Sequence, residues 1–257
     1  MLARIPPGGI NRGMPRLSLF AATDIGLRRS ENEDSYAILP DQEMLAVADG
    51  MGGAAAGEVA SRIFTDTALE VFAAPRSTEE ETVARVQETF RLANERIRGY
   101  ASGNPRFTDM GCTAEVMAFC GEQFVLGHVG DSRVYLLRRG RLKQLTRDHS
   151  LVQEQVEQGL VTSDQARTHA LRNVILRAVG TNDSLAVDIL RGKGLPSDII
   201  LLCSDGLHDM IRDDRICGIV ASQDGIQSKA AQLVEAARSA GGYDNITVAL
   251  CEVLAAG

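Results

Sequence analysis

The sequence predicts an α+β domain in which antiparallel sheets are covered by helices. Short apolar runs rich in Val, Ile, Leu and Phe recur along the chain, and Gly, Asp or Pro residues bound them, which is typical of buried strands. Two amphipathic stretches follow one another between residues 55 and 98, and further apolar runs then come in hairpin-like succession. Because a parallel fold alternates strands with helices, this order favours layered antiparallel sheets.

The elements can be assigned in chain order. The predicted strands are residues 17–22, 36–39, 44–48, 113–119, 124–129, 134–137, 199–203 and 246–251. The predicted helices are residues 55–72, 79–98 and 225–240. In the second helix, apolar side chains recur three and four residues apart and form a stripe that needs an apolar surface to lie on. The stripe consists of Val83, Val86, Phe90, Ala93 and Ile97.

Two segments do not follow this pattern. Residues 146–184 are polar and irregular, with one short helix expected near residues 151–158. We interpret them as a flap inserted over a site, although an ordinary connecting loop would show the same pattern. Residues 1–16 are rich in Pro and Gly and are expected to be a loose leader. We therefore expect one domain over residues 17–254.

Composition excludes several classes of protein. The chain has 257 residues, with Lys+Arg 27 against Asp+Glu 34 and a formal net charge of -7. This balance argues against a nucleic-acid-binding protein and against a polybasic membrane-surface protein. No apolar stretch approaches the roughly 20 residues of a membrane-spanning helix. The five cysteines form no CxxC pair, so we expect neither a zinc site nor a disulfide framework, and the cytoplasm is the predicted location.

Five aspartates stand at the ends of predicted strands. They are Asp34, Asp49, Asp131, Asp205 and Asp244. Taken singly, each fits a turn, since Asp49 and Asp205 precede glycine and Asp244 precedes asparagine. Strands of one sheet can nevertheless bring such ends together, and five occurrences at the same kind of place favour a shared carboxylate cluster.

A carboxylate cluster would need bound cations. Two unit charges 4 Å apart repel each other by about 4 kcal/mol at an effective dielectric constant of 20. The nearest cations in sequence, Arg28, Arg29 and Arg133, are too few to neutralise five carboxylates. An all-oxygen ligand set suits Mg²⁺ or Mn²⁺, while Ca²⁺ would fit on ligand type but no EF-hand pattern is present.

Such a centre has a chemical use at phosphorus. Two divalent cations can activate a water and clamp an in-line displacement. The guanidinium of Arg29, five residues before Asp34, could bind the substrate phosphate through two hydrogen bonds. A solvated surface arginine is the alternative interpretation of Arg29.

The aspartates lie within short motifs that occur in a fixed order. The motifs are residues 29–34 (RSENED), 48–53 (ADGMGG) with 57–61 (GEVAS), 111–114 (GCTA), 130–133 (GDSR), 148–150 (DHS), 171–174 (LRNV), 204–207 (SDGL) and 244–247 (DNIT). Together they resemble the metal-dependent serine/threonine protein phosphatases of type 2C, in their compact bacterial form. The resemblance covers nearly the whole chain from residue 17 onward.

The resemblance implies a four-layer α/β/β/α sandwich, in which two antiparallel β-sheets are flanked by helices and a flap is inserted. It also implies two Mn²⁺ or Mg²⁺ ions at one edge of the sandwich. Asp49 would bridge both ions, and the Gly50 carbonyl would bind one of them. Asp205 and Asp244 would hold the other ion.

Further roles follow from the same resemblance. Asp34 and Glu33 would act on the ions directly or through water. Asp131 would help to bind a third, weaker ion with Asp205 and Asp209. Arg29 would grip the phosphate, so the predicted catalytic residues are Arg29, Asp49 and Asp205.

The implied activity is hydrolysis of phosphoserine and phosphothreonine in proteins. A metal-bridging hydroxide would attack phosphorus without a phosphoenzyme. Expected partners are phosphoproteins and a cognate serine/threonine kinase, with no nucleic acid and no membrane. This chain departs from the family at Ala54, where many bacterial relatives carry histidine, and at Met51, where eukaryotic relatives do, so a histidine general acid from this loop is absent.

Three other functions fit the sequence less well. A nucleotide-binding loop at residues 50–53 lacks the Gly-Lys-Ser/Thr of a P-loop. A non-catalytic phosphoprotein-binding or regulatory module on the same fold would be expected to lose metal-binding aspartates, and all five are present. A two-metal nuclease or small-molecule phosphatase fits the metal chemistry, but the acidic balance disfavours the nuclease.

Overall fold

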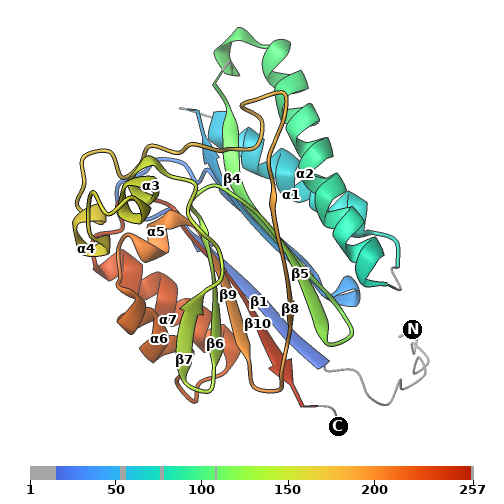
Figure 1. Cartoon of the computed structure of the whole chain (residues 1–257), viewed down its shortest axis with the longest axis vertical. Helices are drawn as coiled ribbons and strands as arrows, with labels where there is room; N and C mark the ends of the chain where they lie inside the picture. Colours follow the sequence, from blue (N-terminus) through green and yellow to red (C-terminus); the bar gives the residue numbers. More distant parts are fainter. Residues whose placement is uncertain (1–15, 53–55, 76–77, 108, 256–257) are drawn as a thin grey trace, which may run out of the picture.

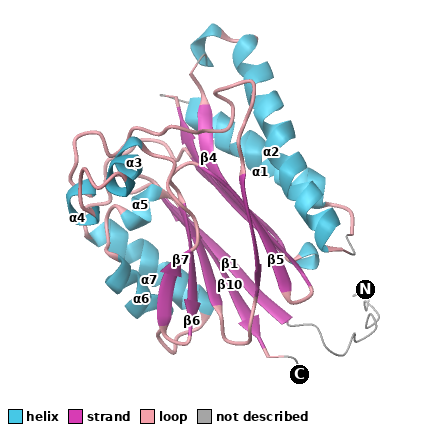
Figure 2. Ribbon diagram, in the orientation of Figure 1, coloured by secondary structure: helices cyan, strands magenta, loops and turns pink. Residues whose placement is uncertain are grey.

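Two five-stranded antiparallel sheets lie face to face at the centre of the protein, and helices cover the outer face of each (Figures 1 and 2). The computed structural model describes residues 16–52, 56–75, 78–107 and 109–255. The predicted order of helix, sheet, sheet and helix is confirmed. None of the described helices is long and apolar enough to cross a membrane.

The first sheet has the strand order β1-β10-β9-β6-β7. Its strands are β1 (Arg16–Asp24), β6 (Arg133–Arg138), β7 (Arg141–Gln144), β9 (Ile199–Cys203) and β10 (Ile246–Leu254). Helices α6 (Asp213–Val220) and α7 (Ile226–Ser239) bury their apolar faces against it. β1 pairs with β10 along its whole length, starting with Arg16 opposite Leu254.

The second sheet has the strand order β2-β3-β4-β5-β8. Its strands are β2 (Asp34–Leu39), β3 (Met44–Met51), β4 (Gly111–Cys120), β5 (Gln123–Val129) and β8 (Asp188–Lys193). Helices α1 (Ala56–Phe72) and α2 (Glu79–Ser102) cover its outer face, as Figure 1 shows.

Strand β3 shows how the sequence orients the sheet. Ala46 and Ala48 pack against the helices, whereas Leu45 and Val47 pack in the layer between the two sheets. Successive side chains of a strand point to opposite faces. Asp49, the next residue in the series of Leu45 and Val47, therefore faces the layer between the sheets.

Helix α2 begins with a capping box. The Thr78 side chain accepts from the Glu81 N–H, and the Glu81 side chain accepts from the Thr78 N–H, so two of the unpaired donors at the helix start are satisfied. The predicted apolar stripe of this helix is buried against the second sheet. The 79–98 prediction is thus confirmed, and the helix continues to Ser102.

All of the predicted strands are present, but strands β7 and β8 were missed. Both lie at the edge of a sheet, and their sequences, RLKQ and DILRGK, are too polar to form an apolar run. Helix α6 and the short helix α5 (Asp205–His208) were also missed. These helices are too short to show a clear apolar period.

Residues 146–184 contain two short helices, α3 (Leu151–Glu157) and α4 (Ser163–Ala166). The first is the short helix expected near residues 151–158.

Residues 1–15, Gly53, Ala54 and Ala55 lie outside the described residues. Arg16, which we assigned to the leader, is the first residue of β1.

Candidate metal centre

Asp34 and Asp49 share one end of the second sheet. Asp34 lies opposite Asp49 where β2 pairs with β3, and Asp49 lies opposite Thr113 of β4. Directly opposed residues in antiparallel strands have Cβ atoms about 5 Å apart. Asp34 is buried and Asp49 is half-buried. The antiparallel register thus brings two of the predicted metal ligands together.

Ser204 joins this pair of carboxylates to the first sheet. Its hydroxyl donates to Asp34 Oδ2 (2.7 Å) and accepts from the N–H of Thr247 in β10 (3.0 Å). Asp205 follows immediately and begins α5. The next residue must be glycine, because a Cβ on Gly206 would lie 1.9 Å from the carbonyl oxygen just before β10. The hydrogen bond of Ser204 therefore brings the turn that carries Asp205 close to Asp34.

Arg29 and Asp244 form an ion pair at the same edge. Arg29 Nη2 donates to Asp244 Oδ2 (2.6 Å), and Arg29 Nη1 lies 3.7 Å from Glu33 Oε2. The Arg29 side chain is 46% exposed, so it remains open to an incoming anion. Buried Asn245 fastens this loop, since its Nδ2 donates to two loop carbonyls and its Oδ1 accepts from the Glu33 N–H (2.7 Å).

Gly50 permits close approach of three backbone segments. Its N–H donates to the Glu33 carbonyl (3.1 Å). A Cβ on Gly50 would lie 2.1 Å from the carbonyl oxygen of Gly57 in α1 and 2.6 Å from that of Glu33. Any side chain here would push apart the loops that carry the carboxylates.

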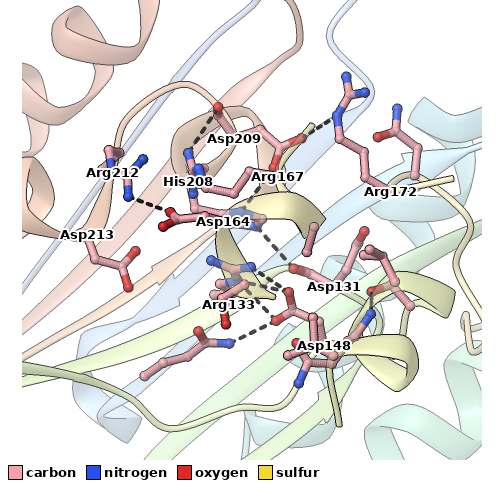
Figure 3. A pocket seen from close by; sticks show the side chains of 18 of the residues that line it. Asp131, Arg133, Asp148, Asp164, Arg167, Arg172, His208, Asp209, Arg212 and Asp213 are labelled. Atoms are coloured by element: carbon pink, nitrogen blue, oxygen red, sulfur yellow. Dashed lines mark hydrogen bonds and ion pairs between the residues drawn. The ribbon is translucent and has the colours of Figure 1, made fainter. Parts of the chain in front are cut away.

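Asp131 lies in the turn between β5 and β6 and borders a cavity of about 510 Å³ (Figure 3). His208 and Asp209 from the end of α5 line the same cavity, and residues 148–173 form its opposite wall. Arg133 also lines the cavity, but three contacts of 2.7 to 3.0 Å bind its guanidinium to Asp148. Its charge is therefore not available to neutralise the carboxylate cluster.

Four aspartates of the cluster, Asp34, Asp49, Asp131 and Asp205, have raised pKa values. Burial raises the pKa of Asp34 to about 6, even though hydrogen bonds oppose the shift. Burial and the charges of Asp148 and Asp209 raise the pKa of Asp131 to about 7. Burial, followed by neighbouring carboxylates, raises the pKa of Asp49 and of Asp205 well above the usual range. Without counter-ions, this edge carries more negative charge than it can stabilise.

The donor chemistry of the cluster fits hard divalent cations. Asp34 Oδ1 and Asp205 Oδ1 are buried and have no hydrogen-bond partner. A buried, unpaired carboxylate oxygen is costly unless a cation or donor meets it. All donors are oxygen atoms, the ligand type that Mg²⁺ and Mn²⁺ share.

The predicted site residues are only partly assembled as ligands. Within the described ranges, no three His, Cys, Asp or Glu side chains form a ready ligand set for one ion. Asp244 is paired with Arg29, and its charge also contributes to the raised pKa values of Asp49 and Asp205. Backbone carbonyls and water would have to complete the coordination, as hard cations commonly allow.

Comparison with known proteins identifies the family. A family model described as protein phosphatase 2C matches residues 28–252. The chain belongs to the protein phosphatase 2C family. The match begins just before the loop that carries Arg29 and extends almost to the end of β10, so it includes every residue of the cluster.

Relatives with known names agree with this membership. The serine/threonine phosphatase Stp of Listeria innocua is 38% identical over 237 residues, which cover 90% of this chain and 93% of that protein. The crystal structure of the Mycobacterium tuberculosis serine/threonine phosphatase PstP/Ppp superposes with a TM-score of 0.87 at 34% identity, covering 93% and 99% of the two chains. A structure of the PstP catalytic domain in complex with two manganese ions gives a TM-score of 0.86 with the same identity and coverage.

Sequence reasoning missed the roles of Ser204 and Asn245. Both lie beside a predicted metal ligand, and each connects that ligand to another element rather than forming a local turn. Their position within the 204–207 and 244–247 motifs was the available signal. Of the positions where relatives carry histidine, Met51 ends β3, and Ala54 lies outside the described residues.

Proposed function

We propose that this protein is a metal-dependent phosphatase that hydrolyses phosphoserine and phosphothreonine in proteins. The observation that carries the proposal is the cluster of buried carboxylates at the sandwich edge, with Arg29 exposed beside it. The pKa values of Asp34, Asp49, Asp131 and Asp205 are all raised by burial, which indicates a place for bound cations. Family membership supports the same activity.

Each residue has a role in this scheme. Asp49 and the Gly50 carbonyl would hold one of two ions. Asp49 would also hold the other ion, together with Asp205 and Asp244. Asp34 and Glu33 would act on the ions directly or through water. When bound, divalent cations lower the pKa of water and withdraw charge from phosphoryl oxygens. The Arg29 guanidinium binds the phosphate and stabilises the charge that develops on it. The phosphoryl group passes to water in one step, without a phosphoenzyme.

Several finer assignments belong to the proposal. Mn²⁺ or Mg²⁺ is the working ion, and Asp131, Asp205 and Asp209 provide a third, weaker site. The phosphatase domain spans residues 17–254, and residues 146–184 act as a flap that selects substrates, because they form one wall of the cavity beside Asp131. The natural substrates are cytoplasmic phosphoproteins, including a cognate serine/threonine kinase.

The decisive experiment is phosphate release from phosphoserine and phosphothreonine peptides. Purified protein should release phosphate with Mn²⁺ or Mg²⁺, and excess EDTA should abolish the activity until the ion is restored. A phosphotyrosine peptide of the same sequence serves as the specificity control. Undiminished turnover in EDTA would contradict the scheme, whereas phosphopeptide binding without turnover would favour a non-catalytic binding module.

A further inference from the structure

The turn from Gly130 to Ser132 carries Asp131 and is held at every residue. Gly130 has a φ of +118°, and a Cβ on it would lie 2.3 Å from Thr113 Cβ. His208 Nε2 donates to the Asp131 carbonyl (3.1 Å), and the hydroxyls of Ser132 and Thr113 share a hydrogen bond (2.7 Å). The position of the Asp131 carboxylate therefore depends on contacts from several elements.

His149 holds Gly130 from both sides. The His149 backbone N–H donates to the Gly130 carbonyl (2.7 Å), and the Gly130 N–H donates to His149 Nδ1 (3.0 Å). The His149 side chain is 1% exposed, so water does not compete for this contact. A single residue thus satisfies both backbone polar groups next to Asp131.

The surroundings of His149 fix its ring. Because Nδ1 accepts a hydrogen bond, the proton lies on Nε2, which faces Asp188 Oδ2 of β8 at 3.2 Å. Arg177 Nη1 lies 3.2 Å from Nε2 and binds Asp188 Oδ1 at 3.0 Å. The ring also packs on that of His128, with 4.7 Å between centroids. Burial and the charges of His128 and Arg177 lower the pKa of His149 to about 4, so the ring is neutral at physiological pH.

His149 also ties together the two ends of the 146–184 segment. Its carbonyl accepts from the Leu176 N–H (2.7 Å), and the neighbouring Ser150 forms a β-bridge with Ile175. His149, near the start of the segment, therefore contacts both Leu176, where the segment runs back past its start, and the turn that carries Asp131.

We propose that His149 is a positioning residue that holds the Gly130–Asp131 turn against the base of the 146–184 segment and thereby sets the Asp131 carboxylate for cation binding. This inference rests on the proposed function of the cluster. Contacts of this kind behind a metal ligand commonly orient the ligand and affect its affinity. To position the turn in this way, residue 149 needs a neutral hydrogen-bond acceptor for the Gly130 N–H at the place of Nδ1. Substitutions that keep or remove this acceptor therefore test the proposal.

The test compares His149→Asn with His149→Leu. Asparagine Oδ1 branches from the same carbon position as Nδ1 and can accept from the Gly130 N–H, while leucine has the same branched shape and no acceptor. His169→Leu, in the same segment, is the matched control, because the His169 ring accepts a hydrogen bond from the Leu171 N–H, two residues away, and so forms a local contact. Mn²⁺ binding is measured by calorimetry, and the Mn²⁺ concentration for half-maximal hydrolysis of p-nitrophenyl phosphate by kinetics.

We expect His149→Leu to raise both the dissociation constant for Mn²⁺ and the Mn²⁺ concentration for half-maximal hydrolysis by about tenfold or more. His149→Asn and His169→Leu should stay close to the wild type in both quantities. Equal losses of Mn²⁺ affinity in the Asn and Leu variants, or no loss in either, would overturn the proposal. Thermal unfolding of all three variants measures their stability, so that a loss of Mn²⁺ affinity can be separated from a loss of folded protein.

A measurement on the unaltered protein covers the case in which His149→Leu does not fold. The Gly130 amide should exchange with solvent as slowly as amides inside the β4–β5 ladder, and its protection should remain in the Asn variant. If the Gly130 amide exchanged as fast as exposed loop amides, the proposed hydrogen bond to His149 would be refuted. Neither calorimetry nor exchange requires turnover, so failure of the proposed phosphatase activity would be distinguished from failure of the His149 assignment.

Discussion

Asp34 lies directly opposite Asp49 in the β2–β3 ladder, and the two carboxylates share the face that looks into the layer between the sheets. Like charges placed opposite each other destabilise a strand pair. Burial raises the pKa of both groups, and each lies within reach of further carboxylates. This edge of the sandwich is therefore destabilising unless protons or cations neutralise it.

The first prediction concerns the pH dependence of stability in the metal-free protein. Asp34 and Asp131 have folded pKa values of about 6 and about 7, above the usual value of 3.8, so the folded state binds protons more tightly than the unfolded state. The stabilisation is complete below the unfolded pKa and is lost as the pH rises through the folded values. We expect the free energy of unfolding in EDTA to fall by about 1.4 kcal/mol or more between pH 6 and pH 8.

Urea unfolding at the two pH values measures this difference. Mn²⁺ at saturating concentration serves as the comparison, because bound cations should raise stability most at pH 8. A metal-free protein that is as stable at pH 8 as at pH 6 would show that the pKa values of Asp34 and Asp131 are not raised in the folded state.

The second prediction concerns Asp49→Asn and Asp205→Asn. Each change removes a charge that we expect to hold cations, so kcat/KM for a phosphothreonine peptide should fall about 100-fold or more. The metal-free variants should unfold at higher urea concentration than the wild type at pH 8, since a buried like charge has been removed. Asp66→Asn, on the exposed face of α1, is the control and should change neither quantity. Strong hydrolysis by Asp49→Asn would remove Asp49 from the mechanism.

The third prediction concerns Arg29→Ala. Loss of the guanidinium should raise KM for phosphopeptides about tenfold, because a charge-assisted contact to the phosphate is removed. The neighbouring Arg28 provides a matched control, since its guanidinium lies over the Tyr243 ring, 5.6 Å from the centroid. Arg28→Ala should leave KM for the same phosphopeptides unchanged. Equal effects of the two changes would indicate a general charge effect rather than phosphate binding.

The fourth prediction concerns Gly50→Ala. The added methyl would lie 2.1 Å from the Gly57 carbonyl oxygen, so β3 and α1 must move apart. We expect a loss of about 1–3 kcal/mol in the free energy of unfolding, together with weaker Mn²⁺ binding. Gly99→Ala in α2 is the control, because a Cβ there meets nothing within 4 Å, and it should stabilise the helix. Unchanged Mn²⁺ binding by Gly50→Ala would remove its carbonyl from the site.

The apolar strands and long helices could be predicted because their signal is local. The stripe of α2 and the alternation in β3 repeat within a few residues, so a single sequence reveals them. Edge strands β7 and β8 lacked this signal, because one face of an edge strand can remain polar.

The candidate site was predicted as a set of residues but not as a geometry. The aspartates could be found because they end strands, yet the sequence contains no sign that Arg29 would bind Asp244 or that Arg133 would bind Asp148. These ion pairs form because the folded chain brings together loops that lie apart in the sequence, and a local sequence pattern does not reveal such contacts. The same holds for Ser204 and Asn245, whose partners lie far from them along the chain.

The pairing of β1 with β10 has a consequence for how the protein is made. β1 is the first described strand, and its ladder partner spans Ile246–Leu254, close to the other end of the sequence. A nascent chain therefore cannot complete its first sheet until residue 254 has left the ribosome, and Leu17, Leu19 and Phe20 have no ladder partner through most of translation. Until then the apolar side chains of β1 stay open to other chains and to chaperones, so the last strand to be synthesised decides when the first one is protected.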